Sequence, residues 1–248
     1  MAKFEISERL KKLPPYLFVE IDKAKKKARD EGRDVIDLGV GDPDIPTPNF
    51  IIEALNKAVK DPSTHRYSLD QGIPEFRSAI SKWYKRRFGI DISPENEIHP
   101  LIGSKEGIAH IPLAFINPGD AVLVPDPCYP PYRSGTLFAG GEVISMPLMA
   151  ENGFLPDLKA INHHSLHKAK MIFINYPNNP TAAICDKKFL KEVVDFAKKH
   201  NIIVACDAAY YEITFDGYKA PSIFEIDGAR EVGVEFHSLS KTFNMTGW

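Results

Sequence analysis

The sequence predicts a three-layer α/β/α fold built around a mainly parallel sheet. Short apolar runs alternate with amphipathic segments through the second half of the chain, which is typical of strands joined by helices. The clearest unit is a strand over 171–175, a helix over 187–200 and a strand over 202–206. Each of these strands ends in polar residues. Because parallel strands end at one edge of a sheet, we expect the functional residues to meet there.

The remaining elements follow in chain order. An arm over residues 4–32, split by Pro14 and Pro15, leads into a basic helix that ends at Gly32. Thr47 is the expected N-cap of a helix over 48–60, with Pro48 at its first position. The later elements are a helix that buries Phe76, Ile80, Trp83 and Tyr84, a helix that begins near Ser104, strands over 121–124 and 142–146, a helix near 157–161, and a strand over 232–236.

The loop over 125–132 is rich in proline, so we expect neither helix nor central strand there. It follows the strand over 121–124 and places two aromatic rings, Tyr129 and Tyr132, at the carboxyl end of that strand. These rings are candidates for contact with a ligand.

Composition excludes several classes of function. Hydrophobic residues make up 44% and charged residues 26%, and 31 basic side chains face 33 acidic ones, so neither nucleic acid nor a membrane surface is indicated. Three widely spaced cysteines form neither a disulfide framework nor a C-x-x-C site. No apolar run approaches the ~18 residues of a membrane span and no secretory signal precedes the arm, so we expect a cytoplasmic protein.

Two other patterns are weak. The spacing of His163, His164 and His167 could present metal ligands, but no cysteine or acidic partner lies nearby, so we expect no metal. The glycines at 39 and 41 begin like a dinucleotide fingerprint, yet Asp44 stands where its third glycine belongs. We therefore reject nicotinamide binding.

The candidate catalytic residue is Lys241, in the turn Ser238-Leu239-Ser240-Lys241 that follows the strand over 232–236. Two enzyme interpretations fit these letters: a Schiff-base lysine flanked by phosphate-binding hydroxyls, or an S-x-x-K serine nucleophile. The plain alternative is a surface lysine. The serine nucleophile would require Ser-Asp-Asn and Lys-Thr-Gly motifs, and neither occurs.

Three further loops supply complementary groups. The helix start at Ser104 and Lys105 suits a phosphate, because free N–H groups and the helix dipole favour an anion there. The loops after the strands at 171–175 and 202–206 supply Asn179 and the pair Asp207 and Tyr210, although Asp207 alone could simply cap a helix. A lysine, a buried carboxylate, an aromatic face, an amide and a phosphate site are what pyridoxal phosphate chemistry requires.

Along nearly its whole length the chain resembles the fold-type I aminotransferases of class I/II. The matching segments are 41–44, 67–77, 103–107, 126–132, 178–181, 207–210 and 238–248. The resemblance implies pyridoxal 5′-phosphate as cofactor, with residues 48–248 as its large binding domain and residues 1–47 as an arm and part of the small domain. The family's pattern continues beyond Trp248 to a phosphate-binding arginine and a C-terminal small domain, so we expect this chain to be part of a longer protein.

The resemblance also implies roles for individual residues. Lys241 would bind the cofactor covalently and then act as the base that moves the substrate Cα proton. Asp207 would keep the pyridine nitrogen protonated, and Tyr210 with Asn179 would bind the phenolic oxygen. Phosphate ligands would be Ser104, Lys105, Ser238 and Ser240, with Tyr67 reaching the phosphate of a neighbouring subunit in a homodimer; Tyr129 would stack on the ring, and substrate contacts would come from Gly41, Tyr16, Lys105, Tyr129 and Asn179.

Substrate choice is less well determined. The arm over 9–18, Lys105 in its motif and the segment 126–130 resemble family members that exchange an amino group between LL-2,6-diaminoheptanedioate and 2-oxoglutarate in lysine biosynthesis. Aspartate, alanine and aromatic aminotransferases share the same catalytic residues. A carbon–sulfur lyase or cyclopropane-forming synthase would also keep Lys241 and Asp207. A cofactor-sensing regulator would need a DNA-binding region, for which residues 1–40 are too short.

Overall fold

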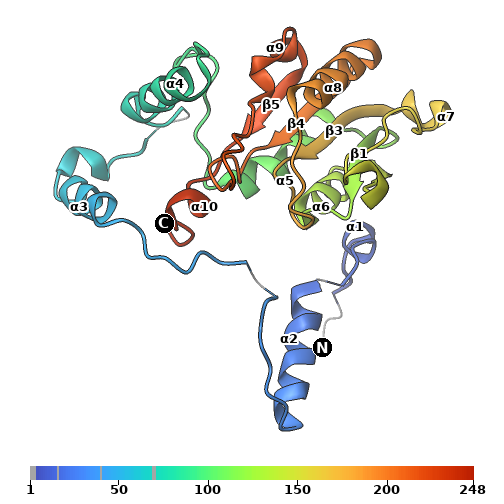
Figure 1. Cartoon of the computed structure of the whole chain (residues 1–248), viewed down its shortest axis with the longest axis horizontal. Helices are drawn as coiled ribbons and strands as arrows, with labels where there is room; N and C mark the ends of the chain where they lie inside the picture. Colours follow the sequence, from blue (N-terminus) through green and yellow to red (C-terminus); the bar gives the residue numbers. More distant parts are fainter. Residues whose placement is uncertain (1–3, 16, 40, 69–70) are drawn as a thin grey trace.

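A computed structural model describes residues 4–15, 17–39, 41–68 and 71–248, and within them five parallel strands form one sheet in the order β2-β1-β3-β4-β5. The strands are β1 (Ala121–Asp126), β2 (Glu142–Pro147), β3 (Ala169–Asn175), β4 (Ile203–Asp207) and β5 (Gly233–Phe236). The predicted strands are confirmed, with ends that shift by one or two residues. Figure 1 shows this sheet in the upper right part of the view, among helices of the second half of the chain.

Helices cover both faces of this sheet. In the described residues the helices are α1 (Glu8–Lys11), α2 (Leu17–Asp30), α3 (Asn49–Ala58), α4 (Pro74–Phe88), α5 (Ser104–Phe115), α6 (Pro130–Phe138), α7 (His163–Leu166), α8 (Lys187–His200), α9 (Ala229–Val232) and α10 (Leu239–Phe243), with short 3-10 turns η1 (Pro62–His65), η2 (Ala150–Asn152) and η3 (Ile223–Glu225). In Figure 1, α2 and α3 stand away from the sheet while α5, α6 and α8 lie on it.

The period of two along each strand builds two cores. In β3, Ile172 and Ile174 pack with the apolar face of α8, whereas Met171 and Phe173 pack with α5 and α6. Leu123 of β1 follows the first pattern, and its neighbours Val122 and Val124 the second. A sheet that is apolar on both faces needs helices on both, so the predicted three-layer α/β/α architecture is confirmed.

Helix α8 shows how local sequence sets an element. Asp186 accepts a hydrogen bond from the Phe189 backbone N–H at 2.8 Å, which caps the first turn. Asn201 ends the helix in the left-handed region with φ 54°. Between them the buried side chains repeat at helical spacing, at Phe189, Leu190, Val193, Val194 and Ala197. The predicted bounds are therefore met at both ends.

The prediction for residues 125–132 is confirmed only for 127–129, which are neither helix nor strand, and is wrong on both sides of them. Pro125 and Asp126 extend β1 and pair with β2. The proline is tolerated because β1 pairs with β3 only as far as Leu123, so Pro125 has a partner strand on one side. Pro130 then opens α6, where its missing N–H would have no helical acceptor and its fixed φ favours the first turn.

The helix expected near 157–161 is absent, and a short helix, α7, follows it instead. The Asp157 carboxylate accepts from the Lys159 backbone N–H at 2.9 Å, a local contact that favours a turn over a helix. Asn162 caps α7 by accepting from the His164 backbone N–H at 2.8 Å. The side-chain oxygen that starts the helix thus lies after the predicted segment.

Two details of the N-terminal helices also differ. Thr47 does not cap α3; Pro48 holds that position, and the Thr47 hydroxyl donates to the Asn244 carbonyl at 2.5 Å. In α4, Tyr84 is buried as predicted, but Phe76 is 39% exposed and Arg77 is buried beside it. Among the described residues, no helix is long and apolar enough to cross a membrane.

Candidate active site

Three strand ends meet at one edge of the sheet. Asn175, Asp207 and Phe236 are the last residues of β3, β4 and β5, and they pair across the ladder in register. The chain order changes direction between β1 and β3, because β2 lies on one side of β1 and the later strands lie on the other. The carboxyl edge beside such a switch is where open α/β sheets bind ligands.

Asp207 is the buried carboxylate of this edge, with the residue only 4% exposed. Its Oδ2 accepts from the Tyr132 hydroxyl at 2.7 Å and its Oδ1 from the Ala209 backbone N–H at 3.1 Å. Burial raises the pKa of Asp207 above its usual value, and these two bonds and the charge of His237 offset only part of that rise. In the described part of the chain Asp207 does not cap a helix, and its only contact of that kind is the hydrogen bond from the Ala209 backbone N–H, which closes a local turn.

Tyr132 was not predicted as a partner of Asp207. It lies on α6, is 1% exposed and stacks on Phe173 with ring centroids 4.6 Å apart and planes at 10°. Tyr129, at the N-cap of α6, meets Tyr132 edge to face at 5.8 Å. The sequence shows both tyrosines, but only the start of α6 at Pro130 determines which one turns inward.

Asn179 and Tyr210 are brought together by a second residue that was not predicted, Asn175. The Asn175 side chain donates to the Asp207 carbonyl at 2.8 Å and accepts from the Asn179 backbone N–H at 2.7 Å. The Asn179 amide then donates to the Tyr210 hydroxyl at 3.4 Å. Burial and then the Asp207 charge raise the pKa of Tyr210, so its phenol stays protonated and remains a donor.

The turn that carries Lys241 starts two residues after β5. The Ser238 hydroxyl accepts from the Ser240 backbone N–H at 3.2 Å and caps α10. Asn244 ends this helix in the left-handed region, and its amide donates to the carbonyls of Pro43 at 3.2 Å and Ile45 at 2.9 Å. The segment after Gly41 therefore lies against the lysine turn, a contact that the sequence did not indicate.

The start of α5 lies beside the end of β5. Gly103 precedes the helix with φ 76°, a backbone that favours glycine, and no side chain caps the first turn. A Cβ on Gly107 would lie 2.5 Å from Leu101 Cδ1 and 2.8 Å from Phe236 Cε1, so a larger residue here would force one of these side chains to shift. The first N–H groups of α5, at Ser104 and Lys105, thus point out near the strand end and suit an anion.

Other predicted site residues are not brought into this group within the single chain. Tyr67 is 96% exposed, and Lys105 and Gly41 are exposed as well. Tyr16 lies outside the described residues. His164 and His167 rings meet edge to face at 5.4 Å, and across the described ranges no three His, Cys, Asp or Glu side chains gather as metal ligands do.

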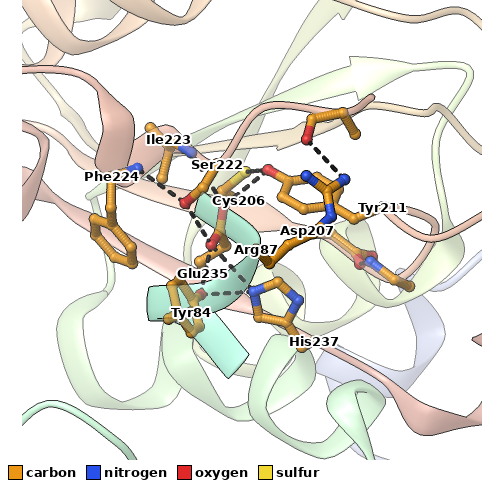
Figure 2. Close-up of polar contacts among 12 residues, drawn as sticks. Tyr84, Arg87, Cys206, Asp207, Tyr211, Ser222, Ile223, Phe224, Glu235 and His237 are labelled. Carbon is orange, nitrogen blue, oxygen red and sulfur yellow. Dashed lines mark hydrogen bonds and ion pairs between the residues drawn. The ribbon is translucent and has the colours of Figure 1, made fainter. Parts of the chain in front are cut away.

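A second buried carboxylate, Glu235 of β5, was also not predicted. Figure 2 shows Tyr84, Ser222 and His237 pointing toward it. Its neighbour His237 had no role in the sequence analysis. A period of two places Glu235 on a buried face of β5, which is the only sequence signal that could have drawn attention to it.

The arrangement fits pyridoxal phosphate. Within the described part of the chain, one hydrogen bond reaches each oxygen of the buried Asp207 carboxylate, which leaves capacity to accept from a protonated ring nitrogen. The uncapped start of α5 suits a phosphate, and Gly107 in the same helix lies against Phe236 at the end of β5. The donor pair at Asn179 and Tyr210 lies beyond Asp207 along the same edge.

Comparison with known proteins agrees with this chemistry. The family model for aminotransferase class I and II matches residues 33–248. LL-diaminopimelate aminotransferases from Aquifex aeolicus and Halothermothrix orenii are 58% and 56% identical over 99% and 98% of this chain, and each match covers 63% of the relative. This chain therefore spans a little under two thirds of the length of those relatives.

Solved structures with the same fold include BacF and an aminotransferase. The substrate-bound BacF structure from Bacillus subtilis superposes with a TM-score of 0.91 at 43% identity, over 99% of this chain and 62% of that one. A probable N-succinyldiaminopimelate aminotransferase from Thermus thermophilus matches with a TM-score of 0.86 at 37% identity, over 94% of this chain and 62% of its own.

Proposed function

Because this chain belongs to the class I and II aminotransferase family, we propose that it forms the cofactor-binding part of a pyridoxal 5′-phosphate-dependent aminotransferase. We further propose LL-2,6-diaminoheptanedioate as amino donor and 2-oxoglutarate as acceptor, which places the protein in lysine biosynthesis. Eight LL-diaminopimelate aminotransferases, 53% to 58% identical over nearly all of this chain, support that choice.

The observation that carries the proposal is the register of Asp207 and Phe236 at the strand ends, with the Lys241 turn directly after. It puts a desolvated carboxylate and a lysine at the same edge of the sheet. When bound, pyridoxal phosphate supplies an electron sink for the electron pair left as the substrate Cα–H bond breaks. The chain must therefore hold the ring and move the proton.

Each residue then has a task. Asp207 accepts a hydrogen bond from the ring nitrogen and keeps it protonated, while the Tyr132 hydroxyl fixes the carboxylate. Asn179 and Tyr210 donate toward the phenolic oxygen. Lys241 would take the proton from the substrate Cα and deliver it to the C4′ carbon of the cofactor. The phosphate is held by Ser104, Lys105, Ser238 and Ser240, and Tyr129 covers a face of the ring.

Substrate contacts follow from the same edge. We assign Tyr16 of the arm and Gly41, with Lys105, Tyr129 and Asn179, to the substrate side. The hydrogen bonds from Asn244 to the carbonyls of Pro43 and Ile45 support the assignment of Gly41, because they hold the segment after Gly41 beside the lysine turn. Residues 1–47 would then form an arm and part of a small domain, and residues 48–248 would form the large cofactor-binding domain.

The protein is proposed to be a homodimer with shared active sites. Apolar side chains in α3 and in the segment before it are exposed in the single chain: Ile36 83%, Leu38 90%, Ile45 76%, Phe50 67% and Leu55 50%. An apolar surface of this kind is typical of a protein interface. Tyr67, at 96% exposure, is free to reach the phosphate of a neighbouring subunit.

A reducing, cytoplasmic location is part of the proposal. The three cysteines carry free thiols, and two of them, Cys185 and Cys206, are buried in the core. Burial raises the pKa of Cys185 to about 12, so it acts as an apolar core residue. A chain with this cysteine pattern suits a compartment in which disulfides do not form.

The test of function is the change in cofactor absorbance when the full-length protein meets single amino donors. The panel is LL-2,6-diaminoheptanedioate, glutamate, aspartate and phenylalanine, with cystathionine as a separate arm. Conversion of the cofactor by the first two and slow conversion by the others is expected. Release of pyruvate from cystathionine without amino transfer would instead indicate a carbon–sulfur lyase.

A further inference from the structure

The Glu235 side chain is fully inaccessible although β5 is an edge strand of the described sheet. Five donors surround its carboxylate: the Tyr84 hydroxyl at 2.5 Å, the Tyr211 hydroxyl at 2.8 Å, the Ser222 hydroxyl at 2.9 Å, the Ile223 backbone N–H at 3.1 Å and His237 Nε2 at 3.1 Å. They come from α4, the loop after β4, the start of η3 and the end of β5. This carboxylate therefore ties four segments together (Figure 2).

These donors keep the carboxylate charged. Burial by itself would raise the pKa of Glu235, but hydrogen bonds from His237, Tyr84 and Tyr211 and the charge of His237 outweigh it and lower the pKa below its usual value. A buried anion of this kind holds its donors strongly, because losing one leaves charge without compensation.

The hydrogen-bond pattern fixes which nitrogen of His237 carries a proton. The Tyr84 hydroxyl has one proton and gives it to Glu235 Oε2. His237 Nε2 lies 2.6 Å from the same hydroxyl oxygen and 3.1 Å from Glu235 Oε2, so Nε2 must be the donor to both. The imidazole is thus oriented by two acceptors at a single nitrogen.

Aromatic contacts hold the same ring from the sides. Trp83 meets His237 edge to face at 5.1 Å, and Tyr211 does so at 5.5 Å. The residue that follows is Ser238, which caps the helix that carries Lys241. His237 is therefore the residue directly before the lysine turn, and a side chain that is held in place there restrains the start of the turn.

We propose that Glu235 and His237 are positioning residues that lock the Lys241 turn: Glu235 anchors the His237 Nε2–H, and His237 fixes the backbone from which Ser238, Ser240 and Lys241 project. The effect on catalysis rests on the proposed aminotransferase function, whereas the locking of the turn does not. No substrate or cofactor touches either residue in this role; both act through the turn.

The test compares two variants of His237 in the full-length protein. His237→Gln places an amide donor where Nε2 lies, and His237→Asn places it where Nδ1 lies, too short to reach Tyr84 and Glu235. Amide hydrogen exchange is measured without cofactor. We expect His237→Asn to speed exchange of residues 238–244 by about tenfold or more while residues 171–175 stay unchanged, and His237→Gln to stay near wild type.

A second readout is the affinity for pyridoxal phosphate, which should fall with His237→Asn and be retained with His237→Gln. Tyr84→Phe, which keeps the ring and removes one partner of Nε2, should give an intermediate increase in exchange confined to the same residues. Unchanged exchange in His237→Asn, equal loss in both His237 variants, or faster exchange throughout the sheet would each overturn the proposal. A wild-type protein that fails to bind pyridoxal phosphate would refute the proposed function while the exchange pattern still tests the lock.

Discussion

Two buried carboxylates lie on adjacent strands and point to opposite faces of the sheet, and they differ in how many hydrogen bonds the protein donates to them. Asp207 ends β4 and Glu235 lies in β5, where it pairs with Cys206, the residue before Asp207. Two donors reach Asp207 and its pKa is raised, with burial as the main cause. Five reach Glu235, and its pKa is lowered despite burial.

The comparison separates a carboxylate that serves the structure from one that can accept further hydrogen bonds. Because side chains alternate along a strand, Asp207 points to α6 and Glu235 to the opposite face, toward η3. Glu235 uses its acceptor capacity to hold the protein together. Asp207 can accept further hydrogen bonds. Its burial carries a desolvation cost that a bound, protonated ring nitrogen would reduce. A stability cost of this kind is typical of a functional site.

The largest expected effect is from Asp207→Ala. Loss of the carboxylate removes the charge that holds the ring nitrogen protonated, so the rate of the amino-donor half-reaction should fall on the order of 10²–10³-fold. Stopped-flow absorbance with a saturating donor measures it. Asp195→Ala, a surface aspartate paired with Lys191, is the control and should leave the rate unchanged. An unaltered rate in Asp207→Ala would refute its assigned role.

Glu235→Ala should lower the stability of the protein more than Asp207→Ala does. It leaves several buried donors without an acceptor, so the free energy of unfolding should fall by about 3 kcal/mol or more in urea titrations of the cofactor-free protein. Glu192→Ala on the exposed side of α8 is the matched control, with an expected change within about 0.5 kcal/mol. A loss no greater than that of the control would mean that the network contributes little.

Asp207→Asn should affect stability in the opposite direction. The folded pKa of Asp207 is raised, so its destabilising charge develops as pH rises from the ordinary carboxyl value through the folded pKa. The amide variant lacks that charge, and in the cofactor-free protein its unfolding midpoint should exceed that of wild type by a few degrees at neutral pH. The difference should shrink toward pH 4, and a midpoint below wild type at pH 7 contradicts the comparison.

The sequence predicted most of the fold because the strands and α8 follow strong periodic patterns with clear caps. It failed where a nonlocal contact decided the outcome. Pro125 can extend β1 because β3 does not pair with β1 beyond Leu123. The Thr47 hydroxyl donates to the Asn244 carbonyl and does not cap α3. Exposure of Phe76 is another case, since helical period alone placed it inward.

The candidate site shows the same limit. Lys241, Asp207, Asn179 and Tyr210 could be proposed as site residues from the sequence because each lies at or after the end of a predicted strand and in a recognisable motif. Tyr132, Asn175 and the Glu235 network could not, since their roles depend on which side chains from distant segments meet beneath the site. A sequence shows which residues carry the chemistry more readily than which residues hold them in place.

The central claim is that this edge of the sheet binds pyridoxal phosphate through Lys241. Borohydride reduction of the full-length protein with its cofactor, followed by peptide mapping, tests it most directly because reduction makes the link permanent. The expected result is a single labelled peptide with the cofactor on Lys241. A label on another lysine, such as Lys105, or no label at all on a protein that binds the cofactor, would contradict the assignment.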